Sequence, residues 1–88
     1  MIDYGNGEDL YWDPVHDEVR FTVPYGGRVL LFRICQKALS KHSRARSPEE
    51  WVAAARDHFS HITHRISDKL SLGLTEPDGS ILIREKDW

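Results

Sequence analysis

The chain has 88 residues, a length that predicts one domain and leaves no room for a second hydrophobic core. Its formal net charge of −2 at pH 7 argues against a typical nucleic-acid-binding domain, because such domains are usually basic. The single cysteine excludes an internal disulfide and a cysteine-rich zinc site, and it favours a reducing compartment. No stretch is apolar enough to cross a membrane and no secretory signal is visible, so we expect a cytoplasmic protein.

The N-terminal residues differ in composition from the rest of the chain. Residues 1–9 are polar and contain Gly5 and Gly7, so we expect a flexible arm on a single domain that spans residues 1–88. A short apolar anchor, Leu10–Trp12, follows the arm. The dipeptide Asp13-Pro14 then predicts a turn.

Residues 18–35 have the pattern of a β-hairpin, with two apolar-rich strands joined by Gly26 and Gly27. A two-residue turn needs positive φ angles, which glycine adopts at little steric cost. This turn sets the register and divides the side chains between two faces of the sheet. One face is predicted to carry the apolar pairs Val19/Ile34, Phe21/Phe32 and Val23/Leu30. The other carries the mixed pairs Glu18/Cys35, Arg20/Arg33, Thr22/Leu31 and Pro24/Val29.

Two helices are predicted after the hairpin, a short one over 36–42 and a long one that begins after Ser47. Ser47 is a good N-cap, Pro48 suits the first helical position, and Glu50 completes a capping box. Gly73 is the expected end of the long helix. Its apolar side chains recur at steps of three and four, as a half-buried helix requires: Trp51, Ala55, Phe59, Ile62, Ile66 and Leu70.

A last strand, 81–83, follows a turn at 77–79. We therefore predict a two-layer α+β fold in the order β-β-α-α-β, with the hairpin and the C-terminal strand packed against one long and one short helix. One layer of helices covers only one side of the sheet. The mixed face, with Pro24, Val29 and Leu31, is then shielded by the N-terminal arm, by a second subunit, or by neither. Exposed apolar faces of this kind are commonly association surfaces.

Charged residues are segregated along the chain. Residues 1–18 hold six acids and no Lys or Arg, whereas residues 19–48 hold seven bases and no acid. The basic block could form a surface for phosphates or an acidic partner. Alternatively, the acidic segment folds back beside the basic hairpin and neutralises it, and we favour this interpretation because the overall charge is slightly negative.

Eight residues make up the candidate binding surface. Two arginines and two apolar residues belong to the mixed face, and four bases belong to the segment that follows it: Arg20, Arg33, Val29, Leu31, Lys37, Lys41, Arg44 and Arg46. The bases of 37–46 could contact nucleic-acid phosphates. No aromatic residue is interleaved among them for stacking on bases, which favours an ordinary solvated surface.

We find no catalytic, cofactor or metal site in the sequence. His58, His61 and His64 recur every third residue, but on a helix this spacing drifts around the cylinder and does not bring three ligands together. We expect a solvated helix face with His64 near Asp68. Cys35 lies near a helix start, yet no general base is placed beside it by the sequence.

Several short motifs also carry a family resemblance. In chain order they are Trp12-Asp13, Val19-Arg20-Phe21, Gly27, Phe32-Arg33-Ile34-Cys35 with Ala38-Leu39, Trp51, His58, Ile62, Ile66, Asp78-Gly79-Ser80-Ile81 and Asp87. Over 10–87 the chain resembles domain-of-unknown-function family 1488, small bacterial proteins with no assigned activity. The resemblance implies an α+β fold and a bacterial cytoplasmic setting, and it brings no catalytic residues. Relatives often carry Cys-Arg-Ile-Ser at 32–35, so a required thiol is not implied.

Together these observations favour a small non-enzymatic protein that acts through contacts with another protein or with a second copy of itself, as a weak homodimer. The alternative is nucleic-acid binding through the basic segment Lys37–Arg46.

Overall fold

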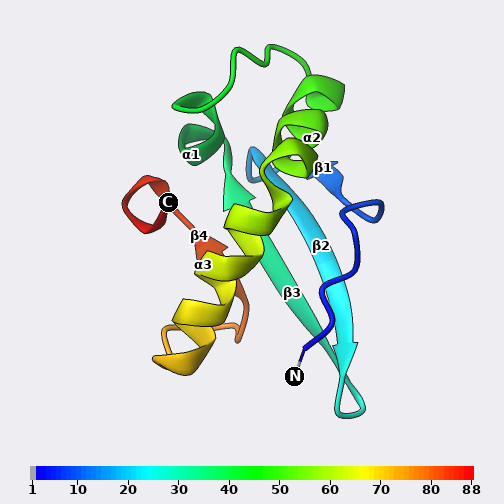
Figure 1. The fold of residues 1–88 in the computed structure, drawn as a ribbon, viewed down its shortest axis with the longest axis vertical. Helices are drawn as coiled ribbons and strands as arrows, with labels where there is room; N and C mark the ends of the chain where they lie inside the picture. The colour runs from blue at the N-terminus through cyan, green and yellow to red at the C-terminus, as the bar shows by residue number, and fades with distance from the viewer. Residues whose placement is uncertain (1) are drawn as a thin grey trace.

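The computed structural model describes residues 2–88 as a four-stranded sheet with helices on one side (Figure 1). The strands lie side by side in the order β1 (Tyr11–Asp13), β2 (Glu18–Tyr25), β3 (Arg28–Cys35) and β4 (Ile81–Ile83). The first three are antiparallel neighbours, and β4 runs parallel to β3. The predicted α+β fold is confirmed. The apolar anchor after the N-terminal arm becomes the edge strand β1.

The register of the hairpin is the predicted one. Val19 lies opposite Ile34, Phe21 opposite Phe32, and Arg20 opposite Arg33. Gly26 and Gly27 have φ angles of 59° and 77°, which is the pattern of a type I′ turn. This turn matches the right-handed twist of the two strands, so local chemistry at two glycines is enough to align both long strands.

The structure divides the long helix expected from the sequence into two. After α1 (Gln36–Ser40) come α2 (Pro48–Asp57) and α3 (Phe59–Ser71), separated at His58, whose φ and ψ of −103° and 18° are not helical. No proline or glycine causes this break. Instead α2 packs over β1 and α3 over β4, at opposite edges of the sheet, so the bend lets one apolar stripe follow a twisted surface.

A short 3₁₀ helix, η1 (Glu85–Asp87), ends the described chain. The predicted N-cap of α2 is present, since the Ser47 hydroxyl accepts a hydrogen bond of 3.3 Å from the Glu50 N–H. None of the helices within residues 2–88 is long and apolar enough to span a bilayer.

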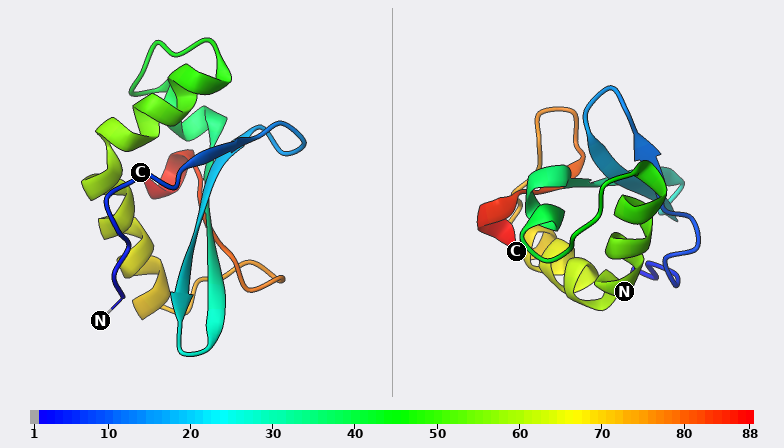
Figure 2. Two further views of the ribbon diagram at one scale, coloured as in Figure 1. Left: turned by 90° about the vertical axis from the view of Figure 1, so that its right-hand side faces the viewer. Right: turned by 90° about the horizontal axis from the view of Figure 1, so that it is seen from above.

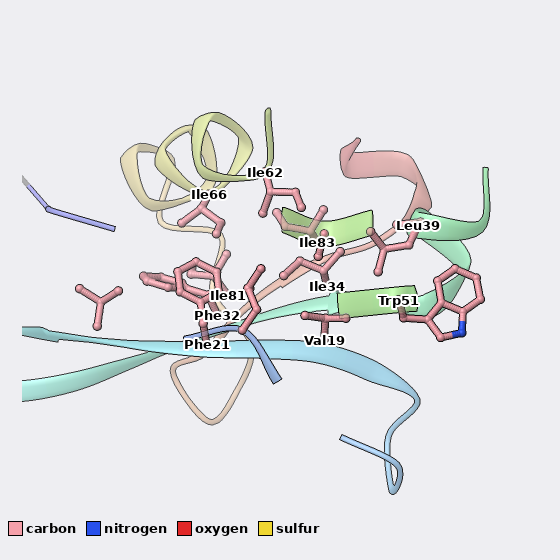
Figure 3. Packing of buried hydrophobic residues seen from close by; sticks show 14 residues of the cluster. Val19, Phe21, Phe32, Ile34, Leu39, Trp51, Ile62, Ile66, Ile81 and Ile83 are labelled. Atoms are coloured by element: carbon pink, nitrogen blue, oxygen red, sulfur yellow. The ribbon is translucent and has the colours of Figure 1, made fainter. Parts of the chain in front are cut away.

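The hydrophobic core lies between the sheet and the helical layer (Figure 3). Its centre is the predicted apolar face of the hairpin, with β4 and α3 completing it: Val19, Phe21, Phe32, Ile34, Ile62, Ile66, Ile81 and Ile83 are all at most 2% exposed. Leu39 of α1 and Trp51 of α2 close one end of this core. The helices therefore cover one side of the sheet, and no helix of residues 2–88 covers the other side (Figure 2).

The N-terminal segment lies on the helical side of the molecule (Figure 2). The Tyr4 ring packs edge-on against Phe32 at 5.6 Å, and its hydroxyl is 2.8 Å from the Ser67 hydroxyl on α3. Farther along, the Arg56 guanidinium donates to the Gly7 carbonyl at 3.1 Å. The residues that their composition predicts to be a flexible arm therefore make defined contacts with the helices and the core.

Candidate functional site

The side of the sheet that faces away from the helices is the candidate functional surface, and we call it the open face. Alternate residues of β1, β2 and β3, together with one residue of β4, form it: Tyr11, Asp13, Glu18, Arg20, Thr22, Pro24, Val29, Leu31, Arg33, Cys35 and Leu82. Within residues 2–88 no helix crosses it, and the N-terminal segment lies on the opposite side (Figure 2). Two turns, one after β1 and one before β4, project on this side and flank it (Figure 2).

A charged cluster occupies the part of the open face farthest from the hairpin turn. Glu18 is only 2% exposed, although it lies on the side of the sheet without helices. Its carboxylate accepts hydrogen bonds from the Nε and Nη2 atoms of Arg33 at 2.6 and 3.0 Å, and from the Nε of Arg20 at 2.5 Å. The two arginine side chains thus cover the carboxylate and remove it from water, and each contact is a charge-assisted hydrogen bond.

The pKa values of the two arginines rise for this reason. For Arg33 the hydrogen bond to Glu18 is the main cause of the raised pKa and outweighs desolvation. For Arg20, desolvation acts to lower the pKa, but the hydrogen bond to Glu18 and the charges of Glu18 and Asp13 together raise it. Both guanidinium groups are therefore held charged and paired within the molecule. These two arginines therefore stabilise the open face and are less available to bind an additional anion.

Asp13 and His16 extend the cluster into the turn after β1. The Asp13 carboxylate is 2.6 Å from His16 Nδ1 and 3.1 Å from Arg20 Nε, and it accepts the Val15 N–H. Desolvation acts to raise the pKa of Asp13, but these hydrogen bonds and the Arg20 and His16 charges outweigh it and lower the pKa. Two acids of residues 1–18, Asp13 and Glu18, thus pair with Arg20 and Arg33 of the hairpin, whereas the N-terminal arm lies on the helical side of the sheet (Figure 2).

The remaining candidate bases lie apart from this cluster. Lys37 and Lys41 are on α1 and just after it, and Lys41 pairs with Glu85 of η1 at 2.9 Å. Arg44 and Arg46 lie in the exposed loop between α1 and α2. The eight predicted residues therefore form two separate groups, one on the open face and one at the end of the molecule that carries α1.

Three histidines gather around Trp88, a contact that sequence reasoning missed. The His42 ring stacks on the indole with centroids 4.5 Å apart, while His58 and His61 approach it at 5.4 and 4.9 Å. His64 points elsewhere, with its Nε2 3.9 Å from the Asp68 carboxylate, as expected. These residues come from three distant segments, so no local spacing could have indicated the cluster. Within residues 2–88 no group of three or more potential ligands is placed to hold a metal ion.

Nucleophilic side chains have no activating partner in the described part of the chain. Cys35 is a free, partly buried thiol on the open face. Ser80 donates a hydrogen bond of 2.6 Å to Asp78, and this hydroxyl together with the Ser80 N–H lowers the pKa of Asp78. That contact closes the turn before β4, and no histidine takes part in it.

No family model and no curated protein matches this sequence. Among solved structures, the chain is similar to a protein of unknown function from family 1488 of Shewanella loihica PV-4. The two share 18% sequence identity and superpose with a TM-score of 0.77, over 92% of this chain and 96% of that one. The superposition establishes a shared fold, and an identity this low assigns no activity. The resemblance to domain-of-unknown-function family 1488 is thus confirmed at the level of the fold, and the function of this α+β protein stays open.

Proposed function

We propose that the protein is not an enzyme and that it acts by binding another protein or a second copy of itself through the open face. The observation that carries the proposal is a sheet with helices on one side only, whose uncovered side is apolar at one end. Val29 is 69% exposed there, and Leu31 beside it is only partly buried. Apolar side chains grouped on an uncovered sheet are typical of association surfaces.

The hairpin half of the open face is the part that we assign to the contact. Arg20 and Arg33 are already paired with Glu18, whereas Val29 and Leu31, nearer the turn, are uncharged and apolar. Within residues 2–88, β1 pairs with Glu18–Arg20 and β4 with Phe32–Ile34, so no described strand lies beside the outer part of the hairpin. Pro24 lies at the outer edge of β2 and offers no N–H there, which disfavours indiscriminate strand pairing on that side. We expect a contact made by side chains of the face.

The test compares Val29→Glu with Leu72→Glu, since Leu72 is equally exposed, at 71%, but follows α3 in the helical layer. Light scattering measures the mass of the wild type and both variants over a wide concentration range. Capture from a cell extract on immobilised protein then tests for other partners. Association or capture that Val29→Glu abolishes and Leu72→Glu preserves supports the proposal. The proposal is contradicted if the wild type and both variants are all strict monomers and all capture the same proteins.

A cytoplasmic location belongs to the same proposal. It is supported by the single free cysteine, Cys35, which suits a reducing compartment.

A further inference from the structure

A hollow of about 400 Å³ lies beside the open face, at the end of the sheet farthest from the hairpin turn. It is formed where two parallel strands end together, since β3 leads directly into α1 and β4 leads into η1 (Figure 1). The segments that follow the two parallel strands therefore lie near each other at this edge of the sheet. Six residues line the hollow: Cys35, Lys37, Leu82, Arg84, Glu85 and Lys86.

The floor of the hollow is apolar. Leu82, which is 9% exposed, and Cys35, a free and partly buried thiol that behaves as a small hydrophobic group, form this floor. The stems of the surrounding lysines add further methylene groups. Its volume lies within the range of small-molecule sites, about 300–1,000 Å³.

The rim of the hollow carries an excess of positive charge. Three of its residues are basic and one is acidic, and two of these four are already paired: Glu85 with Lys41 at 2.9 Å, and Arg84 with Glu76 at 2.6 Å. Lys37 and Lys86 have no carboxylate within 4 Å among residues 2–88, and the nearby Asp87 is bound by Lys69. Lys37 and Lys86 therefore line the hollow without an ion pair among residues 2–88.

We propose that this hollow binds a small carboxylate with an apolar body, such as an aromatic acid. The apolar body would cover Leu82 and Cys35, and the carboxylate would lie between Lys37 and Lys86. The assignment depends on both parts of the ligand. A neutral apolar molecule would form no charge-assisted hydrogen bond with the lysines, and a small hydrophilic anion would leave the apolar floor exposed to water. Ligand binding at this hollow goes beyond the proposed protein contact, which uses the hairpin half of the open face.

The first experiment titrates the ¹⁵N-labelled protein with 2-naphthoate and, separately, with the uncharged 2-naphthalenemethanol. We expect saturable shifts of the amide signals of Cys35, Lys37 and residues 82–86 with the carboxylate, and at least tenfold weaker binding of the alcohol. Bound naphthoate should also slow the reaction of the Cys35 thiol with the neutral reagent 4,4′-dithiodipyridine. Equal binding of the two compounds, or no shift with naphthoate, would overturn the proposal.

A matched pair of variants separates the hollow from general charge effects. Lys37→Glu with Lys86→Glu reverses two charges at the rim, and Arg44→Glu with Arg46→Glu reverses two charges in the loop between α1 and α2. Only the first pair should abolish naphthoate binding, and equal loss in both pairs counts against the site. If acetyl-Phe-Glu-Glu-amide shifts these amides and naphthoate does not, the occupant is a segment of a partner protein and the proposal fails. The Val29→Glu variant, which tests the protein contact, should bind naphthoate as the wild type does.

Discussion

The Lys69 ammonium on α3 is 2.9 Å from the Asp87 carboxylate of η1, and both side chains are largely buried. The same ammonium donates to the Leu82 carbonyl of β4 at 2.8 Å, and the Asp87 carboxylate also accepts the Arg84 N–H. One buried pair thus holds three elements together: the second long helix, the last strand and the final 3₁₀ turn.

Lys69→Met should lower the free energy of unfolding by about 2–4 kcal/mol, because it leaves Asp87 and the Leu82 carbonyl without their partner. Urea denaturation followed by circular dichroism measures the change. Lys86→Met is the control, since Lys86 is exposed and makes no ion pair within residues 2–88. Equal stability of the two variants would show that the buried pair contributes little.

The pair also predicts how stability depends on pH. Desolvation acts to raise the pKa of Asp87, but the Arg84 N–H, the Lys69 hydrogen bond and the Lys69 charge outweigh it and lower the pKa. The folded protein therefore keeps this carboxylate ionised at a pH where the unfolded chain has bound a proton. Its contribution is complete above the ordinary aspartate pKa of about 3.9, and it is lost as the pH falls through the lowered pKa of the folded state.

Asp87→Asn should consequently be less stable than the wild type at pH 7, and the difference should shrink as the pH falls towards 3. Urea midpoints at several pH values give the comparison, with Asp9→Asn at an exposed position as the control. A difference that stays constant over this range would rule out the ion pair as its source.

Glu18→Gln should destabilise the protein by about 2–3 kcal/mol, because it leaves two arginines side by side on the open face with no buried carboxylate between them. Thermal or urea unfolding measures the loss, and Glu8→Gln, at an exposed position, should have little effect. A second change, Arg33→Met in the Glu18→Gln background, should cost less than it does in the wild type. Additive effects of the two changes would mean that the pair is not coupled.

Ser47→Ala should lower stability by about 1 kcal/mol through the loss of the N-cap of α2. Ser60→Ala is the matched control, because Ser60 is exposed in the first turn of α3 and its hydroxyl caps no helix. Since alanine is the better helix former, the control should be neutral or slightly stabilising. Thermal unfolding of the two variants distinguishes a capping effect from a general loss of a hydroxyl.

The hairpin illustrates what a local pattern can establish. Two glycines with positive φ, flanked by alternating side chains, were enough to give the register, both faces and the apolar side of the sheet. The N-cap at Ser47 and the strand at 81–83 were found in the same way. Each of these features depends on residues that are close in the chain, so short-range sterics and hydrogen bonding specify it.

The candidate site was predicted only in part, because most of its features depend on residues that are far apart in the chain. The residues of the open face follow from the hairpin register, but the burial of Glu18 under Arg20 and Arg33 depends on three side chains that meet across two strands. The bend at His58 arises because α2 and α3 follow a twisted sheet, and the hollow around Leu82 forms because β4 joins the far edge of β3. Contacts between segments tens of residues apart leave no periodic trace in the chain, since their energy is gained only when the whole fold brings them together.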